Sequence, residues 1–294
     1  MFFKCKGGST NVTIDGVEVE EDLALSSEMI DTSISTLPYA VLGGHSTVVL
    51  NNEIHLLGTS YGNGVVIASS KYHYKWNGTS WTSVSTLPYN FYFGEAVIYN
   101  NAINILGSYY SETNGGKKHY MFNGSSWTSV STLPFWFKRG NAVVLNDEIH
   151  IMGTEVSGYR TAHYKYNGTS WTNVSTLPYD FYNGSAVVFN DEIHIMGSNG
   201  YHYKYNGSSW TSVSTSPISM NLGKAVVLNG EIHILYSTAH YKWNGSSWTS
   251  VSTLPYGFSA AGAVIYNNYI NILGGMLNTA STYHYEVAKT IYYA

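Results

Sequence analysis

Short apolar runs separated by polar turns fill most of the chain, and the pattern repeats six times. In the unit 141–174 the apolar or aromatic runs are 142–145, 149–152, 163–166 and 171–174. Asn146-Asp147 separates the first two runs and Asn167-Gly168 the last two. Such dipeptides between short runs are typical of tight two-residue β-hairpin turns. Each unit is therefore predicted to form four antiparallel strands, here called a to d in chain order.

The clearest marker of the repeat is the segment 81–89, Trp-Thr-Ser-Val-Ser-Thr-Leu-Pro-Tyr, which recurs with few changes. All six prolines of the chain occupy one position of this unit, and neighbouring prolines are 38 to 50 residues apart. A period in this range is typical of propellers and solenoids, whose units cannot bury an apolar face alone. We therefore expect 31–294 to form one domain, with 1–30 as a separate appended segment.

Composition agrees with a many-stranded protein, because 44% of residues are hydrophobic and only 11% are charged. The net charge of -4 is concentrated in 1–30, while the repeats are balanced and show no basic stripe that would bind nucleic acid. With a single cysteine, Cys5, no internal disulfide can form. No apolar run reaches membrane-spanning length, so we expect no membrane insertion and a location either in the cytoplasm or in a particle assembled inside a cell.

Several features of the unit resemble the kelch repeat over about residues 38–294. They are the paired apolar strands, the glycine after strand b, the tyrosine in strand c and the tryptophan seven residues later. The resemblance implies an all-β fold, a six-bladed kelch-type β-propeller. The glycine pair usual in kelch repeats is present only as Gly274-Gly275, and the fifth unit has Tyr236 there. Either 31–38 or 283–292 could supply the outer strand that closes the ring, and the sequence leaves this open.

The N-terminal segment differs from the repeats in pattern and charge. Residues 12–19 alternate apolar and polar positions around Asp15-Gly16, which predicts a short hairpin. The segment resembles the N-terminal attachment segments of phage tail and virion proteins. This resemblance implies that residues 1–30 dock the protein onto virion or tail proteins, and that the protein is located in the phage particle.

The loops indicate which face of the ring binds a partner. The a–b and c–d turns hardly change between units, whereas the b–c and d–a loops, on the opposite face, vary in length, charge and aromatic content. Variation on a constant scaffold is where repeat proteins place specificity. Phe91, Phe137, Phe181 and Phe258 share one aligned position, so we expect them between blades. The predicted ligand- or partner-binding residues are Tyr92, Trp136, Lys138, Arg139, Asp180 and Tyr182.

A second variable position lies at the start of strand a, facing the expected central channel. It is occupied by Ser46, Glu95, Asn141, Ser185, Lys224 and Gly262. Glu95 and Lys224 belong to opposite units of a six-fold ring, so they could form a polar constriction or remain two separate solvated charges. We predict a channel mouth at Glu95, Asn141 and Lys224.

The eleven histidines are regularly placed. One falls in strand c of every unit: His73, His119, His163, His202, His240 and His284. Metal ligands must converge on one ion, and a ring of repeats spreads them apart. We therefore expect these histidines to hydrogen-bond across strands, and we expect no metal and no cofactor. The repeated tryptophans, such as Trp171, are expected to be buried between blades.

An enzyme is not favoured, because the chain has no nucleophile elbow, phosphate loop or His-Glu-x-x-His motif. Some kelch propellers are copper oxidases, but that chemistry needs a cysteine–tyrosine crosslink and Cys5 lies outside the repeats. A sialic-acid-processing enzyme would call for clustered arginines, whereas Arg139 and Arg160 lie in different regions. The preferred hypothesis is a recognition or adhesion protein that displays its variable face to a host-surface glycan or protein. The alternatives are a structural or decoration virion protein and an intracellular protein-interaction scaffold.

Overall fold

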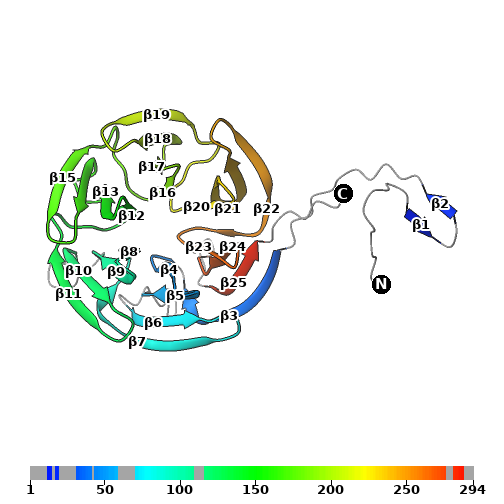
Figure 1. Ribbon diagram of the computed structural model, residues 1–294, viewed down its shortest axis with the longest axis horizontal. Coiled ribbons are helices and arrows are strands. Elements are labelled where there is room, and N and C mark those ends of the chain that lie inside the picture. Colours follow the sequence, from blue (N-terminus) through cyan, green and yellow to red (C-terminus); the bar gives the residue numbers. More distant parts are fainter. Residues whose placement is uncertain are drawn as a thin grey trace.

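The structure is an all-β propeller of six blades around a central channel (Figure 1). The computed structural model describes residues 12–14, 17–19, 31–41, 43–58, 70–108, 116–275 and 281–287. Within these ranges there is no helix, and so none long and apolar enough to cross a membrane. The predicted fold class is confirmed. Outside the ring, β1 (Val12–Ile14) pairs with β2 (Val17–Val19) as the predicted hairpin.

The blades follow one another along the chain, with strand a innermost and strand d outermost. Blade 1 contains β4 (Ser46–Leu50), β5 (Glu53–Leu57), β6 (Ser70–Trp76) and β7 (Trp81–Phe91). Blade 2 contains β8 (Glu95–Tyr99), β9 (Ala102–Leu106), β10 (Lys118–Phe122) and β11 (Trp127–Thr132). Blade 3 contains β12 (Asn141–Leu145), β13 (Glu148–Met152), β14 (Ala162–Tyr166) and β15 (Trp171–Thr176). Blade 4 contains β16 (Ser185–Phe189), β17 (Glu192–Met196), β18 (Tyr201–Tyr205) and β19 (Trp210–Thr215).

The last two blades depart from this scheme. Blade 5 contains β20 (Lys224–Leu228), β21 (Glu231–Trp243) and β22 (Trp248–Phe258). Here β21 carries both the b and c segments, and the chain bends at Ser237 with a φ of 53°. Blade 6 contains β23 (Gly262–Tyr266), β24 (Tyr269–Leu273) and β25 (Ser281–Val287), and its outer strand is β3 (Asp31–Val41). The N-terminal strand therefore closes the ring, which settles the alternative that the sequence left open.

The two kinds of hairpin turn use different chemistry. In the a–b turn, Asn146 and Asp147 both have left-handed backbone, with φ values of 51° and 56°, as the two-residue turn requires. The c–d connection is instead a four-residue loop, so the prediction of a two-residue Asn-Gly turn was wrong. The side-chain oxygen of Asn167 accepts bonds from the N–H groups of Thr169 and Ser170, and only Gly168 is left-handed. Asparagine is used here for its side chain and not for its backbone freedom.

The hydrophobic core consists of six clusters, one at each seam between blades. The four aligned phenylalanines are completely buried, as predicted, and Met220 holds the same position in the fifth repeat. The repeated tryptophans differ from expectation. Trp171 is half-buried, because strand d is the outer strand, whereas Tyr166 at the end of strand c is buried in the same seam. Burial of the repeated tryptophans was therefore overestimated.

A hydrogen-bonded relay of side chains runs across five of the seams between blades. In blade 3, His150 Nδ1 lies 2.9 Å from His163 Nε2, and His163 Nδ1 lies 3.1 Å from the Ser175 hydroxyl. Trp210 of blade 4 donates its indole N–H to the same hydroxyl, 3.1 Å away. Each repeated tryptophan of the described residues thus ties its blade to the preceding one. The histidines hydrogen-bond across strands, as predicted, and the relay explains why His, Ser and Trp recur together.

Blade 2 shows which nitrogen of the strand-c histidine carries the proton. There Asn104 replaces the strand-b histidine, and its amide donates to the carbonyls of Tyr99 and Ala102. The Asn104 oxygen therefore faces His119 Nε2, 2.9 Å away, and can only accept. His119 must then be protonated at Nε2, and its Nδ1 accepts from the Ser131 hydroxyl. Burial lowers the pKa of His119 to about 4, so the neutral form that the relay needs is also the favoured one.

Candidate functional site

A ring of backbone hydrogen bonds joins the d–a loops around the mouth of the central channel. The N–H of Arg139 donates to the carbonyl of Phe93, Asn183 donates to Arg139, and Leu222 donates to Asn183. Two more such bonds, Phe93 to Gly44 and Ala260 to Leu222, extend the series to six loops. The five donors all have left-handed φ values between 53° and 65°. Non-glycine residues adopt this conformation rarely, and such strain concentrates at functional sites.

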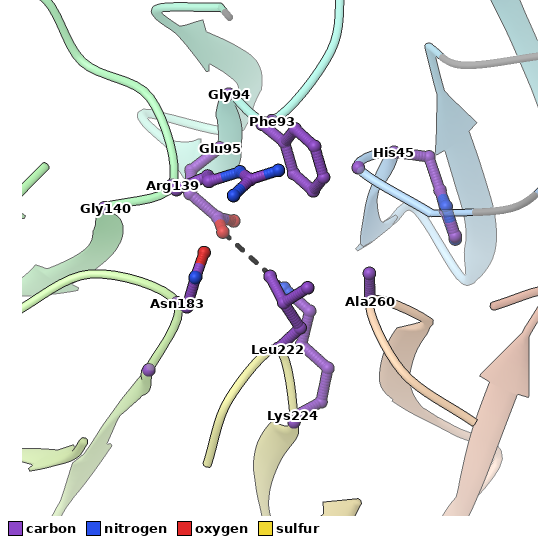
Figure 2. Close-up of a pocket in the computed structure, with 13 residues that line it drawn as sticks. His45, Phe93, Gly94, Glu95, Arg139, Gly140, Asn183, Leu222, Lys224 and Ala260 are labelled. Atoms are coloured by element: carbon purple, nitrogen blue, oxygen red, sulfur yellow. Dashed lines mark ion pairs between the residues drawn. The ribbon is translucent and has the colours of Figure 1, made fainter. Parts of the chain in front are cut away.

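This ring holds six different side chains at one aligned position, within an otherwise uniform repeat. The residues at this position are Gly44, Phe93, Arg139, Asn183, Leu222 and Ala260, and they line a hollow that is open to solvent (Figure 2). The d–a loops that carry these residues pack closely against the backbone of the neighbouring blade. A side chain at Gly153, for example, would meet the carbonyl oxygen of Phe181 in the next d–a loop. The backbone is therefore the same at these positions while the residue type differs, as expected of a recognition site.

The floor of the hollow is the predicted channel mouth. Lys224 Nζ lies 3.5 Å from Glu95 Oε1 across the channel, as Figure 2 shows. Burial raises the pKa of Glu95, and the ammonium group of Lys224 opposes that shift. Asn141 is used differently, because its amide donates to the Gly184 carbonyl and accepts from the Ala186 N–H. Glu95 and Lys224 thus form a polar constriction, while Asn141 ties blade 3 to blade 4.

Two buried acceptors at the mouth have no hydrogen-bond partner among the described residues. His45 bonds through Nε2 to the Leu273 carbonyl at 3.1 Å, so Nε2 carries the proton and Nδ1 has a free lone pair. Burial, with a smaller effect from Lys224, lowers the pKa of His45 to about 3, so the ring is neutral. The second acceptor is the side-chain oxygen of Asn183. Unpartnered buried polar atoms are rare in folded proteins, and here both belong to residues that line the same hollow.

Next to the mouth, a cluster of aromatic and charged residues covers blades 2 and 3. The guanidinium of Arg139 lies 4.2 Å from the centre of the Phe93 ring, in cation–π contact. Glu155 approaches both Lys138, at 3.3 Å, and Arg139, at 3.6 Å. Tyr92 packs on Phe93 with ring centres 4.3 Å apart. The mouth therefore continues into a mixed aromatic and charged surface.

The same surface extends to the next d–a loop. Arg160 lies 3.4 Å from Asp180 and 5.0 Å from the centre of the Tyr182 ring. Trp136 is half-buried, and its carbonyl accepts from the Thr154 hydroxyl. The structure therefore brings five of the predicted residues into two neighbouring groups beside the mouth, with Trp136 at their edge. We call this surface the loop sector, and it comprises Tyr92, Phe93, Trp136, Lys138, Arg139, Glu155, Arg160, Asp180 and Tyr182.

Sequence reasoning missed His45, Phe93, Glu155 and Arg160. Glu155 and Arg160 lie in the b–c loop of blade 3, and the loop lengths alone did not show which side chains would return to the d–a loops. The left-handed position two residues before strand a was a usable signal, because all six units differ there. Arg139, in a d–a loop, and Arg160, in the b–c loop of blade 3, both belong to the loop sector. Each is paired with a carboxylate, Arg139 with Glu155 and Arg160 with Asp180.

The geometry defines this protein as a six-bladed β-propeller with a polar channel mouth and one chemically rich loop sector. The solved structure of YjhT is similar to it, with a TM-score of 0.71 at 12% sequence identity over 87% of this chain and 96% of that one. At this identity the likeness shows the fold alone. No protein-family model matches the chain, and no curated protein does. The resemblance to kelch repeats is therefore not confirmed as family membership.

Proposed function

We propose that this protein is a non-enzymatic recognition propeller that binds a host-surface glycan at the mouth of its central channel. The observation that carries the proposal is the pair of unpartnered acceptors, His45 Nδ1 and the Asn183 oxygen, at one hollow. A glycan is rich in hydroxyl donors that satisfy such acceptors. Phe93 supplies an aromatic face on the same rim, and aromatic rings with nearby polar groups suit sugar rings.

The charges of the site support a polyhydroxylated ligand over a strongly acidic one. Glu155 lies opposite Lys138 and Arg139, and Glu95 lies opposite Lys224. Cations already paired with carboxylates recognise anions less strongly than free ones, because binding an anion would break an existing ion pair. Hydrogen bonding and ring contact are therefore the main sources of affinity.

The second part of the proposal is that the propeller is carried on a phage particle through residues 1–30. Its support is the resemblance of that segment to attachment segments, together with its acidic charge and its separate hairpin, β1–β2. Most of the segment lies outside the described residues. Mass spectrometry of purified particles tests the location, and deletion of 1–30 should abolish incorporation while leaving the propeller folded. If the protein is absent from particles, the alternative of an intracellular protein-interaction scaffold becomes the favoured hypothesis.

Glycan binding is tested with purified protein on an oligosaccharide array that includes neutral, acidic and amino sugars. Asn183→Leu removes the free acceptor, and the site tolerates leucine because Leu222 adopts the same backbone in the next loop. We expect at least a tenfold loss of binding with an unchanged melting temperature. Thr169→Ala, on the opposite face, is the matched control. An array without any signal, combined with binding to a host surface protein, would show that the ligand class is wrong.

A further inference from the structure

Three of the four exposed large hydrophobic side chains in the described residues share one aligned position. Tyr72, Tyr201 and Tyr283 are 47%, 49% and 41% exposed, and each immediately precedes the strand-c histidine. They belong to blades 1, 4 and 6. By the alternation of strand directions, this end of strand c lies on the same face as the variable loops, near its outer rim.

Each of these rings is held by two other tyrosines. Tyr72 packs on Tyr39 from the adjacent blade, with ring centres 5.0 Å apart, and on Tyr74, at 6.1 Å. The other two seams repeat this arrangement with centre distances between 5.4 and 6.2 Å. We call these clusters the tyrosine triads: Tyr39, Tyr72 and Tyr74; Tyr179, Tyr201 and Tyr203; Tyr256, Tyr283 and Tyr285. The exposed ring is thus fixed in place before any ligand arrives.

Packing of the seam does not require the exposed ring. At the seam between blades 4 and 5 the corresponding residues are Ile218 and Ala239, and Ile218 packs against the hydrophobic cluster of that seam. The seam between blades 1 and 2 has Lys118 over the ring of Tyr89, 5.4 Å from its centre. An exposed tyrosine is therefore present at some seams and absent from others that close equally well, so its exposed face has another use.

A hydroxyl group accompanies each exposed ring. The cross-strand partners of Tyr72, Tyr201 and Tyr283 in strand d are Thr86, Thr215 and Thr36, and all three threonines are exposed. A flat ring beside a hydroxyl offers one apolar face and one hydrogen-bonding group. The apolar face of a hexopyranose and its neighbouring hydroxyl groups match this pair, as aromatic residues with a polar handle do at other wet interfaces.

We propose that the tyrosine triads are three equivalent subsites for hexose rings, through which the propeller holds several residues of one neutral polysaccharide. This rests on the proposed function and extends it from one site at the mouth to the rim. The number of platforms indicates the occupant. Three like platforms at separate seams fit a ligand that presents the same group repeatedly, whereas a single protein epitope would need one continuous patch. Linked weak sites gain about 10²–10⁴ in overall affinity without new contacts.

The test measures binding of the full-length protein to immobilised glucan, mannan and galactan by biolayer interferometry. We expect at least one polymer to bind, the triple change Tyr72→Ala, Tyr201→Ala and Tyr283→Ala to weaken binding about 100-fold, and each single change to weaken it far less. Thr169→Ala, on the opposite face, is the control, because the fourth exposed tyrosine, Tyr159, stacks on Phe135 at the position equivalent to Tyr39. A second variant adds a platform: Ile218→Tyr with Ala239→Tyr should strengthen binding to the same polymer.

The outcomes separate this inference from the proposed function. If the triple variant binds as the wild type does while Asn183→Leu loses binding, the triads are not subsites and the mouth alone recognises the glycan. If none of the three polymers binds the wild type, the triad assignment is wrong, and the oligosaccharide array still decides the proposed function. If the triple variant is destabilised, the added-platform variant still tests the inference. Binding by that variant that is no stronger than wild-type binding would overturn it.

Discussion

Mild acid should unfold this propeller, because every histidine is held in its neutral form. All eleven histidines have a lowered pKa, and burial is the first cause for each. In the unfolded chain a histidine takes up a proton near pH 6.5. As the pH falls below 6.5, the histidines of the unfolded state become protonated while those of the folded state stay neutral. The free energy of unfolding therefore decreases down to about pH 4.

His119 and His284 allow the size of the effect to be worked out, because each faces an asparagine and not a second histidine. Burial lowers the pKa of both to about 4. At pH 5 each should cost about 1.36 kcal/mol times 1.5 pH units, roughly 2 kcal/mol, or about 4 kcal/mol together. Glu95 and Glu286, whose pKa values are raised by burial, act in the opposite direction, but they are two groups against eleven histidines. Small domains have about 5–15 kcal/mol in total, so two histidines already remove much of it.

The assay is urea unfolding followed by tryptophan fluorescence at half-unit steps from pH 7.5 to 4.5. We expect the free energy of unfolding to fall by at least about 4 kcal/mol between pH 7 and 5. His119→Gln should lower stability at pH 7.5 but reduce the slope by about one proton, or 1.36 kcal/mol per pH unit. A flat profile between pH 7 and 5, or a folded-state NMR titration of His119 near pH 6.5, would refute the reasoning.

Three further predictions concern the ring and its mouth. Deletion of residues 1–41 removes β3, the outer strand of blade 6, and should abolish cooperative thermal unfolding. Deletion of 1–30 should leave the thermal transition unchanged, and equal transitions for the two variants would contradict closure by β3. Trp171→Ala should cost about 2–3 kcal/mol in urea unfolding, less than for a fully buried tryptophan, and a loss above about 5 kcal/mol would contradict its half-buried position. Glu95→Gln should cost about 1–3 kcal/mol, and adding Lys224→Met should restore most of it; a double variant no more stable than the single one would show that the pair is not coupled.

The fold could be predicted because its determinants are local and repeated. The proline recurs in six units, and the glycine after strand b and the Asn-Asp or Asn-Asn turn recur in five, so the copies confirm one another. The buried phenylalanines could also be predicted from their alignment. Burial of the repeated tryptophans could not, since a strand pattern does not show how much of an outer-strand side chain the neighbouring blade covers. The strand that closes the ring was equally hidden, because 31–38 has the pattern of a strand d while 283–292 continues to Tyr292, where another strand d would begin.

The site was only partly predictable, for a different physical reason. The start of strand a was recognised as variable, and Glu95 and Lys224 do meet across the channel. The partners of Lys138 and Arg139 were missed, because Glu155 comes from a b–c loop whose path depends on non-local contacts. The free acceptor on His45 was hidden as well. It exists only because the ring bonds through Nε2 to a carbonyl of β24, more than two hundred residues away.

The relay and the mouth together show how one repeat serves stability and recognition without conflict. The hydrogen-bonded relay that joins blades in the outer half of the sheet recurs with little change: the strand-c histidine, the serine and, in five blades, the tryptophan. At the inner edge, side-chain bonds from Ser46, Asn141 and Ser185 join neighbouring blades, and between the d–a loops the joining bonds are made by backbone atoms. The side chains at those loop positions are therefore free to differ, and they do so in all six units. The side chains at the mouth can differ because backbone atoms make the hydrogen bonds that join the d–a loops.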